Sequence, residues 1–240
     1  MSALFYEMIL QVSSLYDVAC NGGDKWYAIG GYEDGVEIDS VLLIEISQVD
    51  FSLNFKIFKH SSAPAFLQGH SVVVRGGEIF IGAVTAVTAW TADGSWKKLL
   101  FLKVQPSDFS VSFSGMLGKS GIHDTLDEIA ISSDAEELYF NSGRRSFDLS
   151  NYNCQGSMAK LLVNSEILAW QKKILASDPT NQEAVFATDV ELHNNDVYFT
   201  FMYGGDCLII VLDTSGNEVA KKQFGLTGEK DIISELLFDS

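Results

Sequence analysis

Short apolar runs separated by turn residues recur along most of the chain. The most regular stretch spans residues 189–224, where a strand-like run at 189–193 is followed by the turn Asn194-Asn195-Asp196 and an aromatic run at 197–201. A Gly-Gly turn, an apolar run at 207–212, a second polar turn and a last run at 219–224 complete it. Runs of this length between Gly, Asn and Asp predict four antiparallel strands joined by short turns.

The same plan appears three more times when the chain is aligned on the acidic turn before the second strand. The anchor acids are Asp24, Glu78, Glu137 and Asp196, at spacings of 54, 59 and 59 residues. Third strands are predicted at 41–44, 86–90, 160–163 and 208–211, and fourth strands at 54–59, 95–99, 170–174 and 220–224. A period of this size indicates an array of identical supersecondary units.

With these repeats the chain resembles the β-propeller family, in which four-stranded blades surround an axis. The resemblance covers residues 16 to 225 and lies in the layout, since no Trp-Asp dipeptide marks the units. It implies an all-β, β-propeller-like fold of four blades with four antiparallel strands each, forming one domain over residues 1–240 and closed by the termini. We therefore expect strands at residues 3–12 and in the C-terminal run that contains Ile232, Ile233, Leu236 and Leu237.

The composition and the net charge argue against several classes of function. The chain has 240 residues and a net charge of −16, from 32 acids and 16 bases. This charge argues against binding to nucleic acids or anionic membranes, which require clusters of Lys and Arg. The start lacks basic residues and Glu7 and Gln11 interrupt it, so neither a signal peptide nor a membrane span is predicted.

The cysteines predict a reducing environment. Cys20, Cys154 and Cys207 are widely spaced and form no Cys-x-x-Cys pair, which favours buried free thiols over disulfides or a metal site. We therefore expect a cytoplasmic protein.

The bases have a regular place in the repeat. Eight of the 16 fall on predicted fourth strands: Lys56, Lys59, Lys97, Lys98, Lys172, Lys173, Lys221 and Lys222. In a propeller the fourth strand is the outer edge of a blade, where Lys prevents pairing between molecules. This placement leaves the remaining surface more acidic than the net charge implies.

Acids gather in the connections after the second and fourth strands, and residues 178–218 hold eight acids and no Lys or Arg. Such a surface fits a basic protein partner, although a solvated acidic surface that serves only solubility remains an alternative. Tyrosines beside glycines in these connections are candidate apolar anchors. The predicted partner-binding residues are Tyr32, Glu33, Asp34, Glu37, Asp39, Asp124, Asp127, Glu128, Tyr203 and Asp206.

We find no catalytic or metal-binding motif. The four histidines lack HExxH or His-x-His spacing, no Asp-rich calcium loop occurs, and Gly69-His70-Ser71 is not a nucleophile elbow. The prediction is a monomeric, non-enzymatic binding protein without a cofactor, of the bacterial immunity-protein kind, that inhibits a basic nuclease toxin. Two alternatives stay open: a propeller hydrolase or lyase that uses His70, His123 and acids at a central channel, and a scaffold or ligand-binding propeller.

Overall fold

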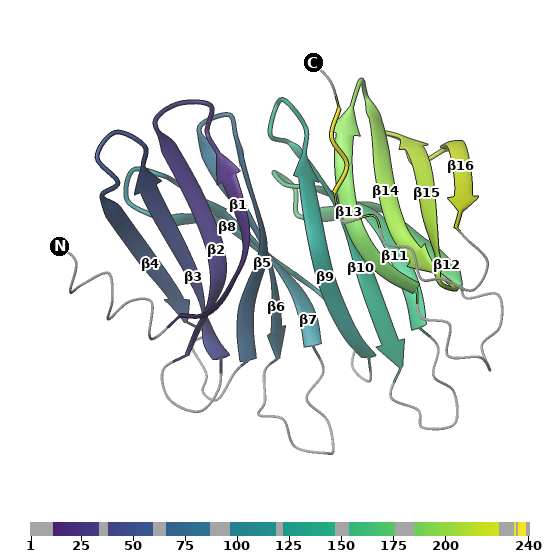
Figure 1. The fold of residues 1–240 in the computed structure, drawn as a ribbon, viewed down its shortest axis with the longest axis horizontal. Coiled ribbons are helices and arrows are strands. Elements are labelled where there is room, and N and C mark those ends of the chain that lie inside the picture. The colour runs from purple at the N-terminus through teal and green to yellow at the C-terminus, as the bar shows by residue number, and fades with distance from the viewer. Residues whose placement is uncertain are drawn as a thin grey trace. The chain divides into compact units, whose positions relative to one another are not determined.

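The computed structural model describes residues 12–33, 38–59, 66–86, 97–118, 122–146, 154–175, 185–225, 233 and 235–238. All regular structure in these ranges is β-strand, arranged in four four-stranded antiparallel sheets (Figure 1). No helix in the described part of the chain could span a membrane. Contacts divide the chain into two compact units, residues 1–120 and 121–240.

The first unit contains two sheets whose strands follow one another in chain order. Sheet 1 consists of β1 (Val12–Cys20), β2 (Lys25–Glu33), β3 (Ile38–Ser47) and β4 (Leu53–Lys59). Sheet 2 consists of β5 (Phe66–Arg75), β6 (Glu78–Ala86), β7 (Lys97–Val104) and β8 (Val111–Leu117). Each sheet is an antiparallel meander, the layout of a propeller blade.

The second unit repeats this arrangement. Sheet 3 consists of β9 (Ile122–Ile131), β10 (Glu137–Ser146), β11 (Cys154–Leu162) and β12 (Ile167–Leu175). Sheet 4 consists of β13 (Val185–His193), β14 (Asp196–Tyr203), β15 (Asp206–Asp213) and β16 (Glu218–Phe224). The prediction of an all-β, propeller-type fold with four four-stranded blades is therefore confirmed.

The core of each unit lies between the faces of its two sheets. In the first unit, Tyr27, Ile29, Val41 and Leu43 of sheet 1 pack against Val72, Ile79, Ile81 and Leu102 of sheet 2. In the second unit, Tyr139 and Met158 of sheet 3 pack against Phe199, Phe201, Leu208 and Ile210 of sheet 4. Burial decreases toward the fourth strand, since β6 is buried along nearly its whole length and β16 is exposed throughout.

Turn chemistry explains why the hairpins form where the sequence predicts them. Gly76-Gly77 between β5 and β6, and Asn194-Asn195 between β13 and β14, all have positive φ angles, from 51° to 77°. Two consecutive residues with positive φ form the tight turn whose twist matches that of paired strands. Glycine and asparagine adopt this conformation at low cost.

The prediction is wrong in sheet 2. Its third strand is Lys97–Val104 and its fourth is Val111–Leu117, whereas the sequence pattern favoured 86–90 and 95–99. Ala86 ends β6, and residues 87–96 lie outside the described ranges. Lys97 and Lys98 consequently lie on a third strand and are partly buried, while the other six lysines of the set are on fourth strands and exposed.

Two further expectations need correction. Ile233 and residues 235–238 have no regular secondary structure, so the expected C-terminal strand does not form there. Of the expected strand at 3–12, only Val12 lies among the described residues, as the start of β1. Cys20 and Cys207 are free thiols, but Cys20 is exposed rather than buried.

Candidate functional site

Every first strand carries a β-bulge at the same point of the repeat. The pairing of β1 with β2 shifts at Tyr16, that of β5 with β6 at His70, and that of β13 with β14 at Thr188. In β9, Asp127 and Glu128 together face Asn141 of β10. A bulge bends its strand and redirects a side chain, so each blade presents a polar residue at an equivalent position.

In the first unit the bulges bring Tyr16 and His70 together. Their rings stack with centroids 4.9 Å apart, and the Gln68 amide donates a hydrogen bond to the Tyr16 hydroxyl. Burial, reinforced by the positive charge of Lys97, lowers the pKa of His70 to about 4. The imidazole is therefore neutral at pH 7. The Asp17 carboxylate, next to the bulge, accepts a 2.7 Å hydrogen bond from the Val72 amide and ties β1 to β5.

In the second unit the first strands β9 and β13 pack together and carry five acids, with no Lys or Arg. The side chain of Asn141 links the backbones of these two strands: it accepts a 3.2 Å hydrogen bond from the Glu128 amide and donates a 2.7 Å hydrogen bond to the Asp189 carbonyl. Burial raises the pKa of Asp127 to about 7. This carboxyl group is only partly ionised at neutral pH.

Charge is separated between the two edges of the sheets, because first and fourth strands are opposite edges. First strands carry six acids (Asp17, Asp124, Asp127, Glu128, Asp189 and Glu191) and one base (Arg75). Fourth strands carry six lysines (Lys56, Lys59, Lys172, Lys173, Lys221 and Lys222) and one acid (Glu218). The predicted placement of lysine on fourth strands is thus confirmed outside sheet 2, and many acids lie on strands rather than in loops.

Another group of acids stabilises turns. Asp50, Asp108 and Asp134 lie between strands and Asp213 is the last residue of β15, and all four accept hydrogen bonds from nearby Ser, Glu or Asn residues. Hydrogen bonds lower the pKa of Asp50 to about 2, and the one from Ser47 contributes more than that from the Ser52 side chain. Hydrogen bonds also lower the pKa of Asp108, Asp134 and Asp213. Part of the acidic character of the chain therefore comes from turn formation.

The predicted site residues of the first unit lie around the end of β2. Tyr32 is half-buried and packs against the cluster of Ala28, Leu42 and Ile44, so it contributes to its own sheet. Glu33 is the last residue of β2, and the backbone of Asp39 belongs to β3. Asp34 and Glu37 lie outside the described residues.

The predicted site residues of the second unit lie in two places, at the β14–β15 turn and on β9. Tyr203 and Asp206 flank the Gly204-Gly205 turn, where Tyr203 packs on the core of the unit and the Asp206 carboxylate accepts a 2.9 Å hydrogen bond from Gln223. Asp124, Asp127 and Glu128 were expected in a loop, but they lie on β9. Asp124 is only 2% exposed, which removes it from any partner-binding surface.

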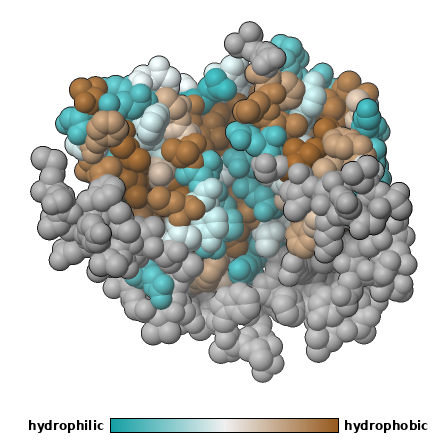
Figure 2. All heavy atoms as spheres, in the orientation of Figure 1, coloured by the Kyte–Doolittle hydropathy of each residue, from teal (hydrophilic) through white to brown (hydrophobic). Residues whose placement is uncertain are grey.

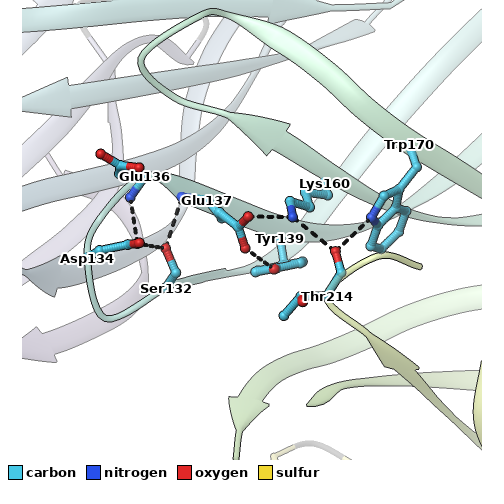
Figure 3. Close-up of polar contacts among 8 residues, drawn as sticks. All are labelled: Ser132, Asp134, Glu136, Glu137, Tyr139, Lys160, Trp170 and Thr214. Atoms are coloured by element: carbon cyan, nitrogen blue, oxygen red, sulfur yellow. Dashed lines mark hydrogen bonds and ion pairs between the residues drawn. The ribbon is translucent and has the colours of Figure 1, made fainter. Parts of the chain in front are cut away.

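A repeated ion pair was not anticipated. In sheet 3, Lys160 contacts Glu137 at 2.5 Å and Glu137 accepts a hydrogen bond from Tyr139, while Lys160 also donates to the carbonyl of Thr214 in sheet 4 (Figure 3). The equivalent pairs are Lys103–Glu78 at 2.7 Å in sheet 2 and, with reversed polarity, Lys25–Glu45 at 3.0 Å in sheet 1. In each case the charged residue of the third strand lies opposite an aromatic residue of the second.

This pair is a structural feature of the blades. Figure 3 shows Lys160 between Glu137 and the Thr214 carbonyl, which also accepts a 3.3 Å hydrogen bond from the Trp170 indole. Within the described ranges no three His, Cys, Asp or Glu side chains are placed to hold a metal ion.

No family profile matches the sequence, and no curated protein sequence is significantly similar to it. Solved structures that resemble it include apo AztD from Citrobacter koseri, with 14% identity and a TM-score of 0.45, covering 88% of this chain and 47% of AztD. A variant of the Synechocystis apocarotenoid oxygenase has 9% identity and a TM-score of 0.48, covering 92% of this chain and 52% of the oxygenase. The chain thus spans about half the length of these two proteins.

Proposed function

We propose that this chain is an acidic, non-enzymatic binding protein that recognises a strongly basic protein through its carboxylates. The separation of charge between sheet edges supports the proposal, because first strands carry four partly exposed acids (Asp17, Asp127, Glu128 and Glu191) against one base, while Asp124 and Asp189 are buried. Like charges held close together repel one another, and an opposing positive surface removes that repulsion.

Asp127 gives the most specific support. Its pKa of about 7 means that the fold opposes its ionisation. A cationic side chain placed beside this carboxyl favours the charged form and lowers its pKa. Binding of a basic partner is therefore coupled to loss of a proton, and affinity increases as the pH rises through 7.

The partner class that fits best is a nuclease toxin, since a nuclease needs a cationic surface for its own substrate. The chain then acts as a cytoplasmic immunity protein of bacterial type that covers this surface. Complementary charge also accelerates association, to about 10⁸–10⁹ M⁻¹s⁻¹ at low salt.

The test measures binding to, and inhibition of, recombinant toxin nuclease domains with a basic isoelectric point, at low and at moderately high NaCl. We expect inhibition at low salt, weakened at least ten-fold at high salt. The test variant carries four neutralising substitutions near the end of β2: Glu33→Gln, Asp34→Asn, Glu37→Gln and Asp39→Asn. We expect it to bind at least ten-fold more weakly.

A matched control has the same change in net charge elsewhere: Asp24→Asn, Glu136→Gln, Asp196→Asn and Glu218→Gln. These residues lie at turns after first and third strands or at the start of the strands that follow them. We expect this control to bind within about three-fold of the parent. Affinity that is indifferent to salt and to the first set of substitutions contradicts the proposal.

A further inference from the structure

Within each unit, one sheet offers a site to which the first strand of the next sheet attaches. On sheet 1 this site includes Asp17, whose carboxylate binds the amide of Val72, and Tyr27, which packs with Val72 in the core. Val72 and Val74 are the second and fourth residues after the bulge of β5. On sheet 3, Tyr139 receives the equivalent residues of β13, Val190 and Leu192.

The same site on sheet 4 is occupied by the C-terminal segment. Asp189, the residue after the β13 bulge as Asp17 is in β1, accepts a 2.5 Å hydrogen bond from the Leu236 amide. Phe238 packs on Tyr198, the counterpart of Tyr27, with centroids 4.7 Å apart, and stacks on His193 at 4.4 Å. The segment lies beside β13 (yellow in Figure 1) and takes the place of a following blade.

Sheet 1 carries the complementary residues, and among the described residues of its own unit no sheet packs on them. Val18 and Cys20 correspond to Val72 and Val74, and Val18 is 59% exposed. Phe51, in the β3–β4 turn, corresponds to Phe109 in the β7–β8 turn, but Phe51 is 73% exposed whereas Phe109 is 6% exposed and belongs to the core. Trp26 and Phe55 are also exposed on this sheet.

Among the residues that the structure describes, the apolar cluster behind these side chains consists of sheet 1 residues. Figure 2 shows apolar atoms gathered over sheet 1 at the upper left. An exposed apolar surface of this kind indicates an interface. Its residues are those that other sheets use to attach to a preceding blade.

We propose that this face of sheet 1 binds sheet 4 of a second copy of the chain, at the site that residues 236–238 occupy, and that the C-terminal segment thereby controls assembly. The Phe238 ring and the apolar side chains of sheet 1 compete for Tyr198, whereas the Val18 amide already donates to Asp17 at 2.6 Å. A whole sheet buries more apolar surface than a segment whose Leu237 is 83% exposed. Assembly therefore follows once the segment is displaced.

The first experiment measures molar mass by light scattering over a range of protein concentrations. The segment is released with Leu236→Pro, which removes the amide donor, and Phe238→Ser, which removes the stacked ring. We expect the parent to remain at 26.4 kDa and the released variant to form species of two or more chains. Adding Val18→Asp and Phe51→Glu should return it to the monomer mass.

A disulfide test identifies the surface. Val74 and Leu192, the counterparts of Cys20, pack on the preceding sheet, and on sheet 3 the residue that receives Leu192 is Tyr139, the counterpart of Tyr198. In the proposed contact Cys20 of one copy therefore lies against Tyr198 of the other. The variant Tyr198→Cys, made in the released protein with Cys154→Ser and Cys207→Ser, should form a disulfide-linked dimer under mild oxidation. Far-ultraviolet circular dichroism checks that the variants keep their β structure.

Each alternative outcome is decisive. An intramolecular Cys20 disulfide, visible as a monomer of altered mobility, shows that the chain closes on itself and overturns assembly with a second copy. A released variant that stays folded, monomeric and without the disulfide overturns the proposal, as does a dimer insensitive to Val18→Asp and Phe51→Glu.

Discussion

Asp127 illustrates how the fold changes the chemistry of a single residue. The sequence suggested a solvated loop carboxylate, but this residue lies at a bulge of β9, where burial raises its pKa to about 7. Asp124 and Glu128 on its own strand, and Asp189 and Glu191 on β13, add carboxylates and no base. The folded protein therefore holds the proton of Asp127 more tightly than the unfolded chain, whose reference pKa is 3.8.

The consequence is a stability that decreases with pH. Between pH 4 and pH 7 the unfolded chain loses this proton first, so ionisation of Asp127 costs the folded state progressively more and levels off above pH 7. We expect Asp127→Asn to raise the free energy of unfolding by up to about 4 kcal/mol at pH 8.5, and by much less at pH 4.5. Urea titrations at the two pH values measure the difference.

Asp213 provides the control of opposite sign. Hydrogen bonds from the Asn217 side chain and backbone lower its pKa, so the stability that its charge contributes is present above pH 4 and lost in more acidic solution. Asp213→Asn should destabilise the protein at both pH values. A pH-independent effect of Asp127→Asn would show that its environment does not oppose charge.

At the scale of elements, the ion pair that recurs in three sheets differs in burial. The side chain of Lys160 is 10% exposed and that of Lys25 is 38% exposed. We expect Lys160→Met to cost roughly 3 kcal/mol, because it leaves Glu137 partly buried without its cation. Lys25→Met should cost less, about 1 kcal/mol, because water reaches the more exposed Lys25 although Glu45 is only 12% exposed, and because Lys160 also donates to the Thr214 carbonyl. Chemical denaturation compares the variants, and equal losses would contradict this ranking.

The β3–β4 and β7–β8 turns supply a second pair for comparison. Asp50-Phe51-Ser52 and Asp108-Phe109-Ser110 have the same sequence, and both phenylalanines have a positive φ, of 55° and 54°. Substitution by alanine therefore has the same backbone effect at both positions. We expect Phe109→Ala to cost about 3 kcal/mol, and Phe51→Ala to change stability by less than about 0.5 kcal/mol in the monomer. Thermal unfolding at low protein concentration tests this.

That repeated Asp-Phe-Ser also marks the limit of the sequence prediction. Apolar runs between short turns define three sheets because each run coincides with a strand. In sheet 2 the pattern predicts the third and fourth strands at 86–90 and 95–99, and the second Asp-Phe-Ser is the signal that the fourth strand begins after residue 110. Bulges and ion pairs depend on strand register, and a one-residue shift of register moves every side chain to the other face of the sheet. Sequence spacing alone therefore does not reveal them.

For the whole molecule, the balance of charge matters more than any single pair. The chain carries twice as many acids as bases, and six of the lysines lie on fourth strands, away from the acids of the first strands. Repulsion among the carboxylates is consequently poorly compensated within the sheets. The Lys103–Glu78 and Lys160–Glu137 pairs are largely buried, so salt screens them only weakly.

Salt should therefore stabilise the free protein. Raising NaCl from 0.02 to 0.5 M shortens the screening distance from about 20 Å to about 4 Å, which weakens repulsion between separated carboxylates more than attraction within the buried pairs. We expect the melting temperature at pH 8 to increase by several degrees. The increase should shrink near pH 4.5, where protonation of carboxylates lowers the net negative charge. A melting temperature that falls with salt would mean that ion pairs dominate, and that the acidic surface carries no repulsion for a basic partner to relieve.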